Sequence, residues 1–113
     1  MLKKSIVGVL VLSLLLGIPA FAVESRASAV PTLTFSQSTA NCEVVIYSTG
    51  SYIEATLSLW YGNTLIDSWD AEGEDVVWIE ENCTVTRRRT YTLVASGTID
   101  GVRFEESVTR TCS

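Results

Sequence analysis

Hydrophobic and polar residues alternate with a period of two from about residue 32 onward. The segment Ile53–Tyr61 shows the pattern most clearly, because its odd-numbered positions are all apolar and its even-numbered positions include Glu54, Thr56 and Ser58. Successive side chains of a β-strand point to opposite faces, so this pattern predicts a strand with one buried face. The same part of the chain carries no helical stripe of apolar residues, and the sequence therefore predicts an all-β domain.

The same pattern predicts about seven strands separated by turn residues. They cover Thr32–Ser38, Cys42–Ser48, Ile53–Tyr61, Thr64–Asp70, Val76 to about Thr86, Thr90–Ile99 and Val102–Thr111. Gly62-Asn63 and Asp100-Gly101 are two-residue loops that tolerate positive φ, so each predicts a tight hairpin. Short antiparallel strands with regular turns in about 90 residues are typical of a β-sandwich.

The N-terminal segment predicts a signal peptide over residues 1–22. A short positive stretch with Lys3 and Lys4 precedes the apolar run Ile6–Ile18, and Ala20-Phe21-Ala22 forms a small-x-small cleavage pattern. A second small-x-small triplet, Ala27-Ser28-Ala29, leaves cleavage after Ala29 as an alternative. The apolar run is shorter than a membrane span, so we expect a secreted, extracellular protein with no stable membrane anchor after cleavage.

Removal of residues 1–22 leaves 91 residues, enough for one small domain. We expect a short flexible segment over 23–31 and a single domain over 32–113. Both lysines leave with the signal peptide, so the mature chain carries six arginines against 13 acidic residues. This acidic balance argues against nucleic acid as a partner, because binding to nucleic acid depends on a positive surface.

Three cysteines, Cys42, Cys83 and Cys112, remain in the predicted mature chain as disulfide candidates. An oxidising extracellular compartment lets a pair of cysteines form a persistent disulfide bond. Because three is an odd number, one cysteine is left as a free thiol or pairs between chains. A dimer linked by a disulfide or by edge strands is therefore compatible with the sequence.

The sequence contains no histidine, which removes the usual general base and the imidazole metal ligand. Glu80-Glu81 and Glu105-Glu106 are adjacent acids on predicted strands, so the two carboxylates of each pair point to opposite faces and do not converge on a substrate. We therefore expect no enzymatic activity and no cofactor.

Aromatic residues on the hairpin at Gly62-Asn63 provide a candidate binding patch. The expected register places Trp60 opposite Leu65 and Thr56 opposite Trp69, which gives an outward patch of Trp60, Leu65 and Trp69. Such a patch would stack on sugar rings or bury against a protein partner. The alternative is a β-bulge that shifts the register and turns tryptophan toward the core.

Two charged clusters are weaker candidates. The acids between Asp67 and Asp75 lack the order of a calcium-binding loop, so we interpret them as a solvated acidic loop and expect no metal site. Arg87, Arg88 and Arg89 form a candidate anion patch, because guanidinium groups grip phosphate and carboxylate. The alternative for the arginines is ion pairing with nearby acids such as Glu80 and Glu81.

The C-terminal part of the chain resembles a known fold. The segment Tyr91–Gly97, followed by Asp100-Gly101 and a last strand, is similar to the F–G hairpin of immunoglobulin-like sandwiches, with Tyr91 at the place of the tyrosine corner. The antibody cysteine is absent, since Leu93 stands at its position.

The resemblance extends to about residues 32–111. The order of Leu57–Tyr61, Asp67–Trp69, Arg89–Leu93 and Phe104–Ser107 is similar to small secreted, functionally uncharacterised immunoglobulin-like proteins of Gram-positive bacteria. The resemblance implies an extracellular address and neighbouring strands for two of the cysteines, which favours a Cys42–Cys83 disulfide over Cys42–Cys112.

The sequence therefore predicts a non-enzymatic extracellular interaction or structural module. Its expected partner is an extracellular protein or a cell-wall polysaccharide that meets the aromatic sheet face. A small secreted effector or antimicrobial-type protein that acts on other cells is the alternative.

Overall fold

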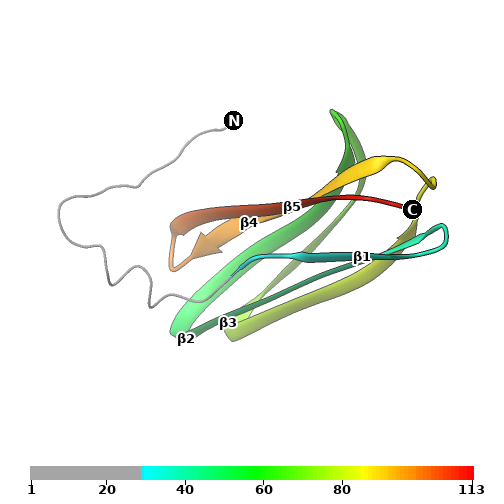
Figure 1. The fold of residues 1–113 in the computed structure, drawn as a ribbon. Helices are drawn as coiled ribbons and strands as arrows, with labels where there is room; N and C mark the ends of the chain where they lie inside the picture. Colours follow the sequence, from blue (N-terminus) through cyan, green and yellow to red (C-terminus); the bar gives the residue numbers. More distant parts are fainter. Residues whose placement is uncertain (1–28) are drawn as a thin grey trace.

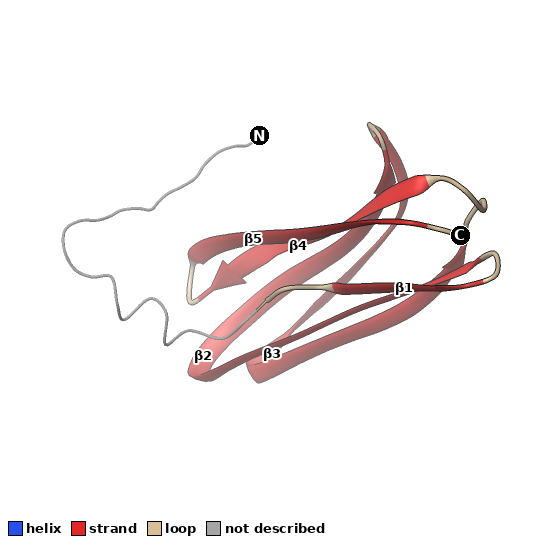
Figure 2. Ribbon diagram, in the orientation of Figure 1, coloured by secondary structure: helices blue, strands red, loops and turns tan. Residues whose placement is uncertain are grey.

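The computed structural model describes residues 29–113, which form one all-β unit (Figure 1). The predicted signal peptide and most of segment 23–31 lie outside the described residues. Residues 29–113 contain five antiparallel strands and no helix (Figure 2). The strands are β1 (Thr32–Ser36), β2 (Thr39–Tyr61), β3 (Thr64–Thr84), β4 (Thr90–Ile99) and β5 (Val102–Thr111). The described range thus includes no helix long and apolar enough to cross a membrane.

All five strands belong to one curled sheet in the order β1-β2-β4-β5, with β3 paired to the other edge of β2. The first part of β2 lies between β1 and β3, and its second part lies between β3 and β4. The β2–β3 pair doubles back at a bend, so the sheet forms a half-barrel whose two layers face each other (Figure 1). β1 and β5 approach each other across the layers and narrow one side of the half-barrel.

The prediction of about seven strands was wrong, because four expected strands merge into two. Expected strands Cys42–Ser48 and Ile53–Tyr61 both lie within β2, and Thr64–Asp70 and Val76–Thr86 join within β3, which ends at Thr84. The register shifts between Ser48 and Tyr52, yet pairing between β2 and β3 continues on both sides of the shift. The sheet therefore bends without ending, and the two layers are parts of one sheet.

Two aspartates fix the bend in β2. Gly50, at φ 80°, donates its backbone N–H to Asp75 Oδ1 at 2.7 Å, and Asp75 itself has a positive φ of 72°. On the other side of the bend, Tyr52 donates its backbone N–H to Asp100 Oδ1 at 2.7 Å. The backbone N–H of Asp100 donates in turn to the Tyr52 carbonyl at 2.8 Å. Carboxylate acceptors thus satisfy backbone groups that the bend takes out of the ladder.

The predicted hairpins are confirmed. Gly62-Asn63 connects β2 to β3, and Asp100-Gly101 connects β4 to β5, whose bounds match the sequence prediction. Asp100 and Gly101 have φ values of 51° and 82°, as a tight two-residue turn between twisted strands requires.

The core fills the concave side of the curled sheet. Its largest fully buried aliphatic side chains come from β1, β2 and β4: Leu33, Val44, Ile46, Ile53, Leu57, Leu59 and Leu93. Burying these side chains supplies the main favourable free energy of folding. One contact of the backbone is especially close, since a Cβ atom on Gly97 would overlap the Glu54 carbonyl oxygen. Glycine at this position lets β4 approach β2.

Tyr91 anchors the connection between β3 and β4. Its ring is buried and lies 5.6 Å from the ring of Tyr61 and 6.1 Å from that of Phe35, measured between centroids. The backbone N–H of Thr86 donates to the Tyr91 hydroxyl at 2.8 Å. The hydroxyl therefore satisfies a backbone donor five residues upstream in the chain.

Candidate binding surface

The structure does not assemble the predicted patch of Trp60, Leu65 and Trp69. Trp60 pairs with Leu65 as expected, but the register shifts between Leu59 and Trp60. This bulge pairs Trp69 with Leu57 on the inner face, where Trp69 is half-buried and packs against the core. The expected pairing of Thr56 with Trp69 was therefore wrong, since a single extra residue moves a side chain to the other face.

Another part of the sheet carries the exposed aromatic surface. Val45 pairs with Trp78 and Tyr47 pairs with Val76, so these four side chains share the outer face of β2 and β3. Tyr47 is 66% exposed and Trp78 is 63% exposed. We call Val45, Tyr47, Val76 and Trp78 the aromatic face. Contiguous apolar surface of this kind marks interaction sites in soluble proteins.

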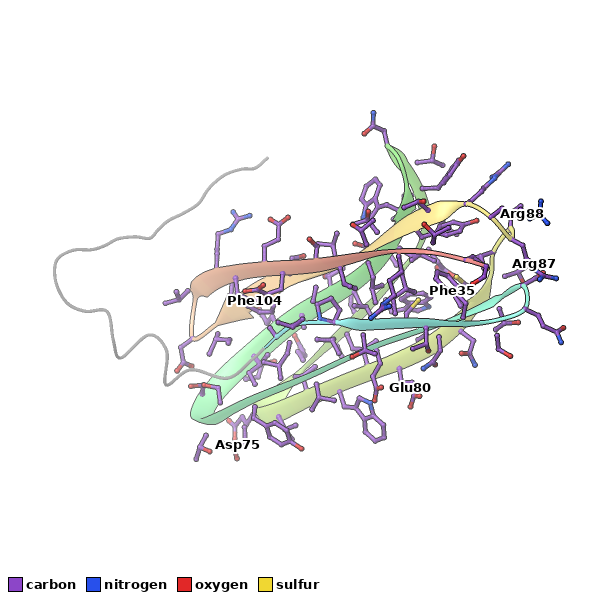
Figure 3. All side chains as sticks on the ribbon, viewed as in Figure 1. Phe35, Asp75, Glu80, Arg87, Arg88 and Phe104 are labelled. Carbon is purple, nitrogen blue, oxygen red and sulfur yellow. The ribbon has the colours of Figure 1, made fainter. Side chains whose placement is uncertain are left out.

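Polar side chains border the aromatic face at one end. Trp78 Nε1 donates to Glu43 Oε2 at 2.9 Å, which ties the indole across the strand pair. Glu43 pairs with Glu80, whose side chain projects from the outside of β3 in Figure 3. Asn41 and Asn82 form the next pair on the same outer face. Rings for apolar contact thus adjoin carboxylate acceptors and amide groups that both donate and accept.

The sequence contained a signal for this surface that alternation alone misses. Val44–Tyr47 and Val76–Ile79 are uninterrupted runs of four apolar residues. Every second residue of each run is buried, such as Ile46 in the first run and Ile79 in the second. Since neighbouring strand residues point to opposite faces, the remaining residues of each run must lie on the outer face.

A cleft of about 350 Å³ lies on the inside of the bend in β3. Its walls come from two stretches of that one strand: Trp69, Asp70, Ala71, Trp78, Ile79, Glu80 and Glu81. Trp69 and Ala71 pack against the core and Ile79 is buried, so the cleft has an apolar inner wall beside an acidic rim.

The predicted acidic loop is part of a strand. Residues 67–75 belong to β3, and Thr56 Oγ1 donates to Asp70 Oδ1 at 2.6 Å. Asp70 also lines a second hollow, of about 570 Å³, with Glu54 and Glu72 on the outer face. Within residues 29–113 no group of three or more candidate ligands is arranged to hold a metal ion.

The three arginines of the candidate anion patch lie in the connection between β3 and β4. Arg87 and Arg88 lie at the end of the molecule that carries the C-terminus (Figure 3). Arg87 Nε donates to the Ser113 backbone oxygen at 3.0 Å, and the Arg89 guanidinium lies 4.6 Å from the centre of the Tyr61 ring. Within the described part of the chain, these contacts involve neither Glu80 nor Glu81, so the structure does not show the alternative pairing with those acids.

All three cysteines are free thiols in the structure, so the predicted disulfide bond is not formed. Cys42 pairs with Glu81 and Cys83 with Ala40, which makes the two cysteines diagonal neighbours on the inner face of β2 and β3. Burial, together with the adjacent Cys83 thiol, raises the pKa of Cys42 to about 12. Burial also raises the pKa of Cys83, with the charge of Asp67 adding to the effect. Cys112 is buried and donates its thiol to the Gln37 carbonyl at 3.2 Å.

No protein-family model matches this chain, and a search of curated proteins finds no significant match. The candidate site therefore rests on the geometry of the residues themselves. That geometry offers an exposed aromatic surface with a polar border, suited to non-covalent binding.

Proposed function

We propose that this protein is a secreted, non-enzymatic binding module whose aromatic face binds cell-wall polysaccharide. The observation that carries the proposal is the pair Tyr47 and Trp78, both more than 60% exposed on adjoining strands of one sheet face. Leaving two large rings in water is unfavourable unless a ligand covers them, so this surface is the strongest candidate for recognition.

The borders of the face favour a carbohydrate. Sugar rings present apolar C–H faces that stack on aromatic rings, and their hydroxyl groups donate to carboxylates. Glu43 and Glu80 supply such acceptors beside Trp78, and Asn41 and Asn82 supply amide groups. An open sheet face, unlike a closed pocket, also leaves room for a polymer to continue beyond the contact.

We also propose that the strands follow an immunoglobulin-like arrangement. Three features support this: the bend divides β2 and β3 between two facing layers, β4 and β5 form the terminal hairpin, and the Tyr91 hydroxyl accepts from Thr86. The last feature has the form of a tyrosine corner. The absence of histidine from the whole sequence supports a non-enzymatic role.

The extracellular address is tested separately from binding. The intact mass of the protein recovered from the culture medium of its host is expected to correspond to a chain that begins at Val23. A mass that begins at Val30 would place cleavage after Ala29. Retention of residues 1–22 would contradict the secreted assignment.

The binding proposal is tested by co-sedimentation with purified Gram-positive peptidoglycan, stripped of teichoic acids so that no phosphate contributes. Tyr47→Ala and Trp78→Ala are each expected to reduce the bound fraction at least about tenfold, because each removes a ring from the contact. Trp60→Ala is the matched control, since Trp60 lies on the other layer and donates to Ser58. Equal binding by all three variants, or no binding by the wild type, would overturn the carbohydrate assignment.

A further inference from the structure

The outer edge of β3 has no partner strand in the part of the chain that the structure describes. β3 is 21 residues long and pairs only with β2, so its other side presents unpaired backbone N–H and C=O groups. Such an edge is a template for an added strand, and proteins commonly protect long edges against it. What this edge accepts depends on the side chains along it.

The cleft inside the bend of β3 opens along the same edge. Trp69 and Ala71 from one half of β3 face Ile79 from the other half. A strand that paired with the second half of β3 would direct alternate side chains toward this apolar wall. Its remaining side chains would lie on the outer side, next to Glu80.

The charge of β3 is of one sign. The strand carries seven acidic residues and no lysine or arginine. Asp67 and Glu81 pair with the buried residues Leu59 and Cys42, which places both carboxylates on the inner side, at the open mouth of the half-barrel. Within residues 29–113 no arginine forms an ion pair with either carboxylate.

The negative charge of β3 determines which kind of strand can pair with its free edge. If two copies of the chain paired edge to edge through β3, the seven acidic residues of one copy would lie beside the seven of the other. Repulsion between these like charges opposes such a dimer. A segment with lysine or arginine would instead neutralise the rim while its apolar residues covered Trp69 and Ile79. The edge therefore discriminates against self-pairing and in favour of a basic strand.

We propose that the free edge of β3 is a strand-addition site for an extended peptide segment that alternates apolar and basic residues. Backbone hydrogen bonds to β3 provide affinity, and the cleft and its acidic rim provide selectivity. The partner class is a basic protein segment. This proposal goes beyond the aromatic face. Trp78 and Glu80 adjoin both sites, but Tyr47 does not line the cleft, so a substitution of Tyr47 separates the two sites.

The test measures binding of a fluorescently labelled hexapeptide of alternating lysine and valine by anisotropy. Binding is expected to weaken as salt rises, and Glu80→Lys, on the outer side where the lysines of the peptide lie, is expected to weaken it at least about tenfold. Tyr47→Ala is expected to bind the peptide like the wild type while losing peptidoglycan. A peptide with glutamate in place of lysine is expected not to bind.

Two N-methylated peptides separate strand addition from simple charge attraction. Alternate residues of an added strand turn their N–H groups toward the neighbouring strand, so methylation of the valine amides or of the lysine amides must abolish binding while the other is tolerated. If both methylated peptides bind as tightly as the parent, no strand is added and the proposal is overturned. Unchanged affinity of Glu80→Lys, or dimerisation of the protein through β3, would overturn it as well.

Discussion

The two outer faces of the curled sheet differ in how their side chains are satisfied. On β2 and β3, the aromatic face leaves Tyr47 and Trp78 mostly in solvent. On β4 and β5, the outer face is largely hydroxylic: Thr90 and Thr111 are hydrogen-bonded at 2.8 Å, and Thr92 and Thr109 at 3.1 Å. Trp60, on the same layer, is half-buried, whereas Trp78 is mostly exposed, although the indole N–H groups of both donate to an acceptor at 2.9 Å.

This difference indicates a division of labour within one sheet. Hydroxyl groups that satisfy one another across a strand pair stabilise the layer and leave little for a ligand to use. Exposed rings beside an acidic border add little to folding and stay accessible to a ligand, so this face is the one suited to binding. Substitutions on the β4–β5 layer should therefore change stability, and substitutions on the aromatic face should change binding.

The largest expected effect is that of Gly97→Ala on stability. The added Cβ would overlap the Glu54 carbonyl oxygen, and φ is 152° at this position, which disfavours any side chain. Because the obstacle is backbone, β4 must move away from β2. We expect the free energy of unfolding to fall by about 3 kcal/mol or more, measured by urea denaturation.

Gly101→Ala is the matched control for this substitution. Its φ is 82°, yet a Cβ atom there would meet nothing within 4 Å. Only the cost of a positive φ remains, which is about 1 kcal/mol. Equal losses for the two variants would show that the close approach of β4 to β2 at Gly97 does not constrain the sheet.

The second prediction concerns the cysteine pair beneath the aromatic face. Oxidised glutathione is expected to join Cys42 to Cys83, with the two thiols giving up their hydrogens to reduce the glutathione disulfide. Peptide mapping identifies the linked pair. The bond closes a loop across positions 42 and 83 and is expected to raise the free energy of unfolding by about 2–4 kcal/mol.

The rate of this oxidation should depend on pH. Thiolate is the attacking species, and the raised pKa of both cysteines keeps the thiols protonated at neutral pH. The reaction is therefore slow near pH 7 and accelerates as the pH rises toward the raised pKa values of the two thiols. Linkage of Cys112 in place of Cys83 would contradict the assignment, and Cys112→Ala provides the control because it leaves the predicted pair intact.

Sequence reasoning predicted the local features of this fold well. The hairpins at Gly62-Asn63 and Asp100-Gly101 follow from residues that tolerate positive φ, and the bounds of β4 and β5 follow from alternation between such turns. These features depend on a few neighbouring residues. Tyr91 was similarly predictable, since its hydroxyl reaches only to Thr86.

Features that depend on register were not predictable. The bulge between Leu59 and Trp60 moves Trp69 from the outer to the inner face, and no residue at that position marks the shift. The continuity of β2 through its bend depends on Asp75 and Asp100, which come from distant parts of the chain. The candidate site moved from the predicted patch to Tyr47 and Trp78 for the same reason, because face assignment is a property of strand pairing.

The third prediction is a moderate loss of stability for Tyr91→Phe. The substitution keeps the ring against Tyr61 and Phe35 and removes only the hydroxyl. The Thr86 N–H then loses its acceptor in a half-buried setting, which costs about 1–2 kcal/mol. Urea denaturation measures the loss, and peptidoglycan binding should not change. No loss of stability would show that water replaces the hydroxyl at no cost.

The smallest expected effect on stability, and the sharpest contrast between the two faces, comes from Glu43. Glu43→Ala removes the acceptor of the Trp78 indole N–H on an exposed surface, so the free energy of unfolding should change by less than about 0.5 kcal/mol. Without this acceptor the indole is free to rotate, and ordering it on contact with a ligand costs binding free energy. Peptidoglycan binding should therefore weaken several-fold, whereas Glu43→Gln, whose amide oxygen still accepts, should keep most of it. If Glu43→Gln weakens binding as much as Glu43→Ala, the carboxylate contributes its charge to the ligand directly and does not act by orienting Trp78.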